Sequence, residues 1–276
     1  MRAVMVQDKL SQTRDFWDAN PCDGQSETRR RMQFRYRKEP WLPPLLDEIA
    51  EHENVLEIGC GQGTDAIYCC QRMNESASYT GIDISPISVQ NAQSAVTTMS
   101  STLRVLPTLV QGNAENLSFD DSSFDCVVST GVLHHTPSLE NSLSEVRRVL
   151  RPDGLAVISL YRLFSPKLLG AYALRLPVRF GVRLFAAHDS VRRMLDKIGT
   201  DHLLGTMLHE CLEVPILNSY TRKELNDAFS AFAAVSIVPV GFGFALFGAA
   251  KYIDFNMPWL GAMWVVTARN HADIVK

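Results

Sequence analysis

The sequence predicts a doubly wound α/β domain, and three observations carry this prediction. Residues 55–58 form a branched aliphatic run of the kind found in strands that are buried on both faces. A turn with three glycines, GCGQG, follows at once, and the next stretch, TDAIYCCQRM, has the pattern of a helix. Strand, glycine turn and helix make up the first unit of a doubly wound fold, in which ligands bind at the carboxyl ends of the strands.

The glycine turn at residues 59–63 is typical of nucleotide sites, because glycine accepts positive φ and lets a ligand approach the backbone. A P-loop would continue with lysine. Here Gly63 is followed by Thr64 and Asp65, so no side chain would hold a β- or γ-phosphate, and this interpretation is excluded. The dinucleotide pattern G-x-G-x-x-G requires glycine where Thr64 stands, which weakens it and leaves a nicotinamide oxidoreductase as an alternative.

The pattern that remains is E-x-G-x-G-x-G, which begins at Glu57. In this motif the sequence resembles the class I S-adenosylmethionine-dependent methyltransferases. A second predicted strand ends in Asp83, twenty residues after Gly63, where an acid can accept hydrogen bonds from a ribose diol. A third strand precedes Asn113 and a fourth covers residues 124–130. A helix, a Pro-Asp-Gly turn and another aliphatic strand complete the expected order by about residue 160.

The resemblance implies a Rossmann-like seven-stranded sheet whose last strand is antiparallel. The last two strands would be residues 235–240 and 263–270, joined by an unusually long apolar link, 241–261. Residues 231–250 carry no charge over the length of a membrane span, but Pro239 and the glycines after it favour a strand at this place. The link is rich in Phe, Ala and Gly, so it can wall a lipophilic pocket or simply pack against neighbouring segments.

The resemblance also implies how the cofactor, S-adenosylmethionine, would be held. It has no phosphate, so its site needs no lysine; a helix starting near Thr64 offers N–H groups to the methionine carboxylate. Glu57 would receive the ammonium group and Asp83 the ribose hydroxyls. At Asn113 the family commonly has an aspartate that accepts from the adenine amino group, and the missing charge weakens this contact. The expected cofactor-binding residues are Glu57, Gly59, Cys60, Gly61, Gly63, Thr64, Asp83, Ile84, Asn113, Ala114, Glu115, Ser129, Gly131 and Tyr36. S-adenosylhomocysteine would be the product.

The motif GVLHHTP follows the fourth strand, at the rim where cofactor and acceptor should meet. Its imidazoles, His134 and His135, titrate in the range useful for a base and are the candidates for catalysis or acceptor contact; a hydrogen-bonded structural role stays equally open. Two adjacent histidines cannot easily bind one ion, and no third ligand stands at a recognisable spacing, so we expect no metal. The N-P-P-Y-type motif of nucleic-acid amino methylation is absent at residues 129–132.

Whole-chain properties favour a soluble enzyme with a small-molecule substrate. The net charge of −3 and the pI near 6.2 give no basic field, so we expect no nucleic-acid partner. The six cysteines include no C-x-x-C pair and lie mostly inside apolar elements, which favours buried thiols. Because the first ten residues lack the apolar run of a signal peptide, we expect a cytoplasmic protein.

We divide the chain into an N-terminal cap segment, residues 1–44, and a methyltransferase domain, residues 45–276. In the cap we expect a loop, RDFWDANPCDG, and then a helix that stops before Pro40. The candidates for cofactor contact in the cap are Trp17, Tyr36 and Arg37. Four arginines of this segment are accompanied by acids and are interpreted as a solvated helix face: Arg29, Arg30, Arg31 and Arg35.

Residues 161–216 interrupt the fold after the fifth strand as a helical insertion that is apolar and basic. No acid occurs between Asp153 and Asp189, whereas five basic residues do, namely Arg162, Lys167, Arg175, Arg179 and Arg183. Such a segment can form a substrate lid, a homodimer contact or a peripheral membrane contact, and the first two are favoured. After it, the spacing of Thr221 and Glu224 predicts a capping box at the start of the next helix.

Together these features predict methyl transfer from S-adenosylmethionine to an oxygen or carbon atom of a small, apolar acceptor, near the quinone-biosynthesis and natural-product branch of the resembled family. Two alternatives remain. The same fold and cofactor can serve a non-methylating cyclisation, or the chain can be a cofactor-binding scaffold without turnover.

Overall fold

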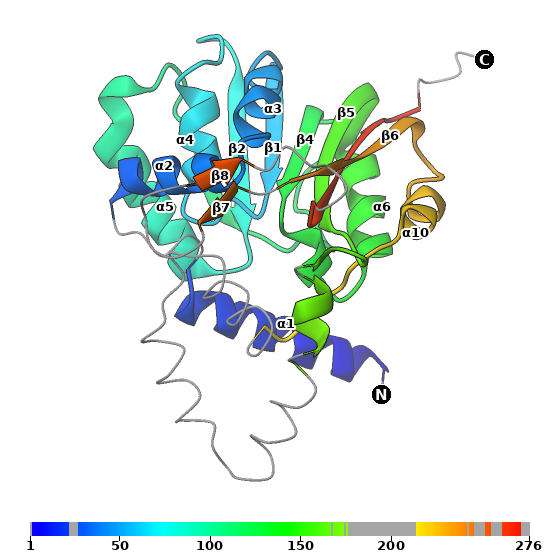
Figure 1. Cartoon of the computed structure of the whole chain (residues 1–276). Coiled ribbons are helices and arrows are strands. Elements are labelled where there is room, and N and C mark those ends of the chain that lie inside the picture. Colours follow the sequence, from blue (N-terminus) through cyan, green and yellow to red (C-terminus); the bar gives the residue numbers. More distant parts are fainter. Residues whose placement is uncertain are drawn as a thin grey trace, which may run out of the picture.

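The computed structural model describes residues 2–21, 27–166, 168–173, 175, 214–241, 243–245, 252–254 and 261–271. Helices cover both faces of one large sheet, and a long N-terminal helix lies across one end of it (Figure 1). The helices are α1 (Arg2–Ala19), α2 (Thr28–Lys38), α3 (Leu42–Ile49), α4 (Thr64–Cys70), α5 (Pro86–Met99), α6 (Leu139–Val149) and α10 (Arg222–Ala228), with short 3-10 turns η1 (Ser100–Thr102) and η2 (Leu133–His135). The strands of the large sheet are β1 (Asn54–Ile58), β2 (Ser78–Asp83), β3 (Thr108–Gln111), β4 (Phe124–Thr130), β5 (Leu150–Tyr161), β6 (Ala233–Val240) and β9 (Met263–Arg269).

The sheet has the order β3-β2-β1-β4-β5-β9-β6 and confirms the predicted seven-stranded topology. Parallel pairing joins β3 through β5, while β9 runs antiparallel to both β5 and β6. The last two predicted strands therefore form the expected antiparallel pair. Glu57 of β1 lies beside Gly81 of β2 on one side and Val128 of β4 on the other, so the carboxyl ends of these three strands meet at one edge.

Two apolar cores, one on each face, hold the helices to the sheet. Neighbouring strand residues alternate between them: Val55 packs toward α3, α4 and α5, and Leu56 toward α6 and α10. Side chains of a strand alternate in direction, so a continuous apolar run is what a strand covered on both faces requires. The predicted capping box is present, because the hydroxyl of Thr221 accepts from the backbone N–H of Glu224 and the Glu224 carboxylate accepts from that of Thr221.

The N-terminal cap differs from the prediction in its first half. Residues 14–19, which were expected in a loop, continue α1, and the helix ends at Ala19, just before the Asn-Pro turn. Near this end Asp18 accepts from the hydroxyl of Ser85 at 2.6 Å, and the ring of Trp17 lies 5.3 Å from that of His135. The end of α1 therefore reaches two loops that follow different strands at the carboxyl edge (Figure 1).

The link between β6 and β9 contains a feature that the sequence pattern does not predict. Strands β7 (Gly243–Ala245) and β8 (Tyr252–Asp254) pair with each other in a separate two-stranded sheet. This small sheet lies away from β6 and β9, with β7 against α2 of the cap (Figure 1). The rest of residues 241–261 falls largely outside the described residues, so its predicted role as a pocket wall stays a prediction.

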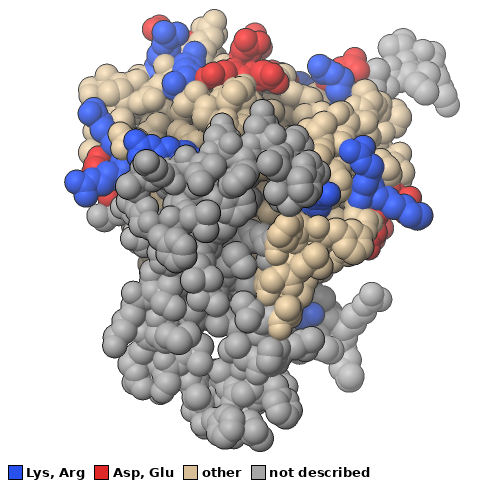
Figure 2. Space-filling view, viewed as in Figure 1, with Lys and Arg blue, Asp and Glu red and all other residues tan. Residues whose placement is uncertain are grey.

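Most of the predicted insertion, residues 161–216, also lies outside the described residues. Its described beginning packs on the sheet, where Leu168 is buried beside Tyr161 of β5 and Met263 of β9. The hydroxyl of Tyr172 donates to the carbonyl of Leu217 at 3.2 Å, so this beginning is tied to the chain that leads into α10. In the described part of the chain no helix is both long and apolar enough to cross a membrane. Charged side chains of both signs are mixed over the described surface of the face shown in Figure 2.

Candidate active site

The glycine turn has the backbone that the sequence predicts. Gly59, Gly61 and Gly63 have φ values of 83°, 50° and 76°, a region that other residues rarely adopt. Gly59 is also required by packing, because a Cβ there would lie 2.2 Å from a methyl carbon of Val132. The N–H groups of Gly59 and Cys60 donate to the carbonyl of Ile82 at 2.7 and 2.9 Å, which fixes the turn against the end of β2.

Glu57 is buried beside this turn, and only 3% of its surface is exposed. The hydroxyl of Tyr79 donates to its carboxylate at 2.9 Å. Burial, and then the nearby carboxylate of Asp65, raise the pKa of Glu57 to about 8. A buried carboxyl group of this kind favours a cationic ligand, because a positive charge at hydrogen-bonding distance offsets the cost of ionising it.

Asp83 connects the end of β2 to the glycine turn. Its carboxylate accepts from the N–H of Gly61 at 2.8 Å and from the N–H of Ser85 at 2.9 Å. Burial raises the pKa of Asp83, and these two backbone donors act in the opposite direction. Each oxygen can accept a second hydrogen bond, so Asp83 can orient the turn and still receive a diol. Through Ser85 the same site is tied to Asp18 of α1.

The residues after β3 are engaged in local contacts. The side-chain oxygen of Asn113 accepts from the N–H of Glu115 at 3.0 Å, so one of its two lone pairs is used within the turn. The carboxylate of Glu115 accepts from the N–H of Ser138 at 2.6 Å and thereby joins this turn to the start of α6. Ala114 is buried among apolar neighbours of the second core. Ile84 is half-buried at the end of β2, where its carbonyl accepts from Gln111.

The remaining predicted cofactor residues divide into two kinds. The hydroxyl of Ser129 donates to the carbonyl of Ile58 inside the sheet, and the thiol of Cys60 is buried, with a pKa well above its usual value because of that burial. Gly131, by contrast, has φ of 77°, and a Cβ built on it would meet no atom within 4 Å. Open space beside a glycine at a strand end is what a ligand that approaches the backbone needs.

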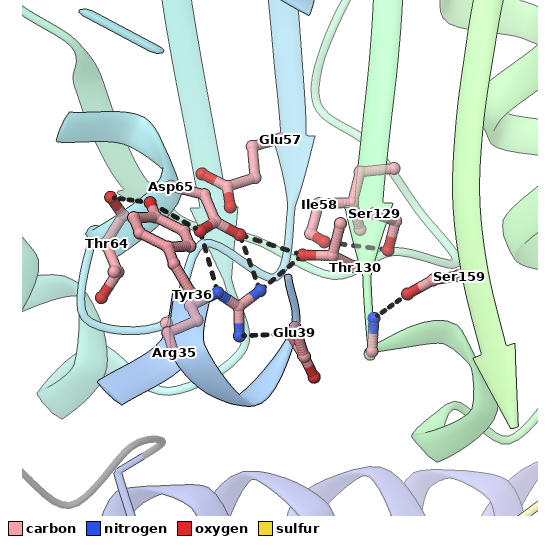
Figure 3. Close-up of polar contacts among 12 residues, drawn as sticks. Arg35, Tyr36, Glu39, Glu57, Ile58, Thr64, Asp65, Ser129, Thr130 and Ser159 are labelled. Atoms are coloured by element: carbon pink, nitrogen blue, oxygen red, sulfur yellow. Dashed lines mark hydrogen bonds and ion pairs between the residues drawn. The ribbon is translucent and has the colours of Figure 1, made fainter. Parts of the chain in front are cut away.

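The cap contacts the glycine turn through α2, which corrects the interpretation of its arginines. Arg29 and Arg30 are exposed as predicted, but Arg31 is buried and the side chain of Arg35 is only 14% exposed. Arg35 makes a bidentate ion pair with Asp65, the second residue of α4, at 2.6 and 2.8 Å (Figure 3). The expected solvent exposure is wrong for Arg31 and Arg35, because the side chains of these two arginines contact acceptors that are distant in the sequence.

Of the other two cap candidates on α2, Tyr36 is half-buried against α4, whereas Arg37 is exposed; contact of Tyr36 with the cofactor stays a prediction. The Tyr36 hydroxyl contacts the carbonyl of Thr64 and the carboxylate of Asp65, each at 3.2 Å. Thr64 itself is buried and begins α4, directly after Gly63. Tyr36 therefore contacts the start of α4, the helix whose N–H groups we expect to bind the methionine carboxylate.

Both predicted catalytic histidines are buried in η2, after β4. The Nδ1 atom of His135 lies 2.7 Å from the carbonyl oxygen of Ile216; a carbonyl only accepts, so Nδ1 carries a hydrogen. His134 stacks on Tyr161 at the end of β5, with ring centroids 3.9 Å apart. With Trp17 of α1 these rings form an aromatic wall, defined here as Trp17, His134, His135 and Tyr161.

The donor set around the glycine turn fits S-adenosylmethionine. Two acids end adjacent strands, Gly131 leaves an open approach to the backbone, and the turn carries no lysine for a phosphate. Within the described residues no three His, Cys, Asp or Glu side chains are grouped as metal ligands. A seven-stranded sheet with this strand order, a glycine turn after β1 and acids at the carboxyl ends of β1 and β2 define the class I S-adenosylmethionine-dependent methyltransferase domain.

Comparison with known proteins agrees with this class. Residues 56–158 match the family model described as a methyltransferase domain, so this part of the chain is a methyltransferase domain with S-adenosylmethionine as its cofactor. The chain is 39% identical over 104 residues to a phthiotriol/phenolphthiotriol dimycocerosates methyltransferase from Mycobacterium leprae, which covers 37% of this chain and 35% of that protein. It is 36% identical over 120 residues to a fatty-acid O-methyltransferase from Mycolicibacterium smegmatis, covering 44% of this chain and 41% of that protein.

The match to these curated relatives thus spans well under half of their length. Two solved structures extend the likeness to most of the chain. A methyltransferase from Thermotoga maritima has a TM-score of 0.53 at 17% identity and covers 86% of this chain and 90% of that one. One from Aquifex aeolicus has a TM-score of 0.52 at 15% identity, covering 85% and 92%. At such identities the likeness is one of fold.

Proposed function

We propose that this chain transfers the methyl group of S-adenosylmethionine to an oxygen or carbon atom of a small, apolar, lipid-like acceptor. The observation that carries this proposal is the aromatic wall, which stands beside the glycine turn at the same edge of the sheet. Val132, in the loop that bears the two histidines, is the residue that packs on Gly59. Cofactor residues and aromatic wall are therefore adjacent.

Three further features support an apolar acceptor. Trp17 is the half-buried member of the wall, and aromatic side chains are common in pockets for hydrophobic ligands. Phe164 and Leu169, at the described start of the insertion, are 65% and 50% exposed, so apolar surface continues outward from the end of β5. The relatives named above act, by their names, on a fatty acid and on phthiotriol dimycocerosates, which are lipids.

In the proposed reaction the cofactor residues and the aromatic wall would have separate roles. The cofactor supplies a methyl group already activated by the sulfonium charge. Glu57, Asp83 and the glycine turn bind and orient it, and the aromatic wall aligns the acceptor and excludes water, which is the main requirement of an in-line displacement. Where the acceptor atom carries a proton, our candidate for the base is His135, whose ring is oriented by the contact of Nδ1 with the Ile216 carbonyl.

The first experiment is calorimetric titration with S-adenosylhomocysteine, beside NADH, of the wild type, Asp83→Asn and the matched control Asp120→Asn. Asp120 is exposed and lies outside the site, so only the Asp83 variant should lose affinity. Production of S-adenosylhomocysteine is then measured with a long-chain fatty acid, a long-chain alcohol and a quinol. Binding of NADH alone would overturn the proposal in favour of an oxidoreductase.

Two other outcomes would also contradict methyl transfer. Product formed without S-adenosylhomocysteine would indicate a cyclisation. Cofactor binding with no turnover of any acceptor class would indicate a scaffold.

A further inference from the structure

A buried polar cluster joins the cap to the cofactor site, and the cofactor residues assigned so far do not account for it. Its members are Arg35 and Tyr36 of α2, Glu39 directly after α2, Asp65 of α4 and Thr130 of β4 (Figure 3). The Arg35 guanidinium donates to both oxygens of Asp65 and also to the hydroxyl of Thr130, at 2.8 Å. The same hydroxyl donates to Asp65 at 3.1 Å, so guanidinium, carboxylate and hydroxyl close a ring.

This ring lies at a functional position, because it joins both loops that shape the cofactor site. Asp65 follows the glycine turn by two residues, and Thr130 precedes Gly131, where the structure leaves open space. Arg31, one turn earlier on α2, donates to the carbonyl of Gln62 inside the glycine turn at 3.4 Å. One helix of the cap therefore contacts the glycine turn at Gln62 and the start of α4 at Thr64 and Asp65.

The ring also sets the charge around Glu57. The carboxylates of Glu57 and Asp65 face each other with no hydrogen bond between them, and Arg35 lies on the far side of Asp65 (Figure 3). The titratable and charged groups that interact electrostatically with Glu57 come from the glycine turn, α4, β2 and α2. They are Cys60; Asp65, Cys69 and Cys70; Tyr79 and Asp83; and Arg35. Among these described groups the positive charge is that of Arg35.

We propose that Arg35 is a positioning residue of the cofactor site, which clamps the glycine turn to the end of β4 and balances the carboxylates around Glu57, so that docking of α2 is coupled to cofactor binding. This inference rests on the proposed function for the identity of the ligand only. Arg35 suits the role because its planar fork binds a carboxylate with two parallel hydrogen bonds and still has donors left for Thr130.

The test compares Arg35→Gln and Asp65→Asn, which break the same ion pair from opposite sides. The charges act on Glu57 in opposite directions: Asp65 raises its pKa and Arg35 lowers it. Affinity for S-adenosylhomocysteine is measured by calorimetry from pH 6 to 9.5. With Arg35→Gln the pH at which affinity is half-maximal should move up, and affinity at pH 7 should fall about tenfold or more. With Asp65→Asn this pH should move down.

A residue that only stabilised the fold would weaken binding in both variants and move the pH profile in the same direction or not at all, and that result would overturn the inference. The double variant Arg35→Gln/Asp65→Asn, which leaves neither charge unpaired, should return the profile toward that of the wild type and serves if a single variant does not fold. Arg30→Gln is the matched control, because Arg30 lies on the same helix with 76% of its side chain exposed.

A second measurement does not depend on the ligand. In the cofactor-free protein, hydrogen exchange at the amides of residues 60–66 should become about tenfold faster in Arg35→Gln and stay unchanged in Arg30→Gln. Unchanged exchange in Arg35→Gln would contradict the clamp. If exchange responds as expected while the wild type binds no S-adenosylhomocysteine, the clamp stands and the proposed function fails.

Discussion

Replacing Glu57 by glutamine should make the protein more stable at high pH while it weakens the cofactor site. The pKa of Glu57 is raised from 4.5 to about 8 by burial and by Asp65. Between these two values the folded protein holds a proton that the unfolded chain has released. The free energy of unfolding therefore falls as pH rises through this window, and the loss is complete once pH exceeds about 8.

The size of the effect follows from the same pKa. Each pH unit inside the window costs about 1.4 kcal/mol, so the stability lost through Glu57, relative to pH below 4.5, is on the order of 2 kcal/mol at pH 6 and 5 kcal/mol at pH 9. Glutamine has a similar shape, can still accept from Tyr79 and cannot ionise. Relative to the wild type, Glu57→Gln should thus gain about 3 kcal/mol of stability between pH 6 and pH 9.

Urea-induced unfolding, followed by tryptophan fluorescence at pH 6, 7, 8 and 9, measures this difference. Subtracting wild type from variant removes the contributions of all other titrating groups. The control is Glu51→Gln, at an exposed carboxylate, for which the difference should not change with pH. A flat difference for Glu57→Gln would refute the reasoning, and so would unchanged affinity of this variant for S-adenosylhomocysteine at pH 8.

Three further predictions concern the loops around the site. Gly59→Ala should cost about 2–4 kcal/mol in urea unfolding and abolish S-adenosylhomocysteine binding, because of its positive φ and the contact of the new Cβ with Val132; wild-type stability would contradict this. His135→Gln should lower kcat about 100-fold for a hydroxyl acceptor without changing cofactor affinity in calorimetry; equal rates would make the ring structural. Trp17→Ala should raise KM for a lipophilic acceptor in a steady-state assay, with cofactor affinity nearly unchanged; the reverse pattern would place Trp17 on the cofactor side.

The strands, the helices and the acids beside the glycine turn could be predicted because their signals are local, whereas the arrangement of the seven-stranded sheet was implied by the family resemblance. An aliphatic run of four to seven residues, a glycine turn and an acid at a strand end are each readable within a short window. The burial of Glu57 also follows from its place inside the aliphatic run that forms β1. A short stretch of sequence does not show which distant residue each side chain will contact. The contact of Tyr79 with the Glu57 carboxylate could therefore not be predicted.

The arginines of α2 show the same limit more sharply. Exposed and buried arginines look alike in a helix that is flanked by acids, and only the pairing of Arg35 with a residue thirty positions away separates them. One signal was available: Asp65 is the single charge in an otherwise apolar helix, and a buried charge requires a partner. The paired strands β7 and β8 gave no comparable signal, because the apolar link around them has neither regular alternation nor clear turn boundaries.

The ion pair between Arg35 and Asp65 has a consequence for where the smallest working unit of this chain begins. The segment shared with the curated family, residues 56–158, contains Asp65 but not Arg35. A fragment cut at those limits would bury a carboxylate without its guanidinium, at a cost of about 3–5 kcal/mol, and would lose the apolar face of α3 as well. We therefore expect a fragment that begins before α2 to be more stable than one cut at the limits of the family match.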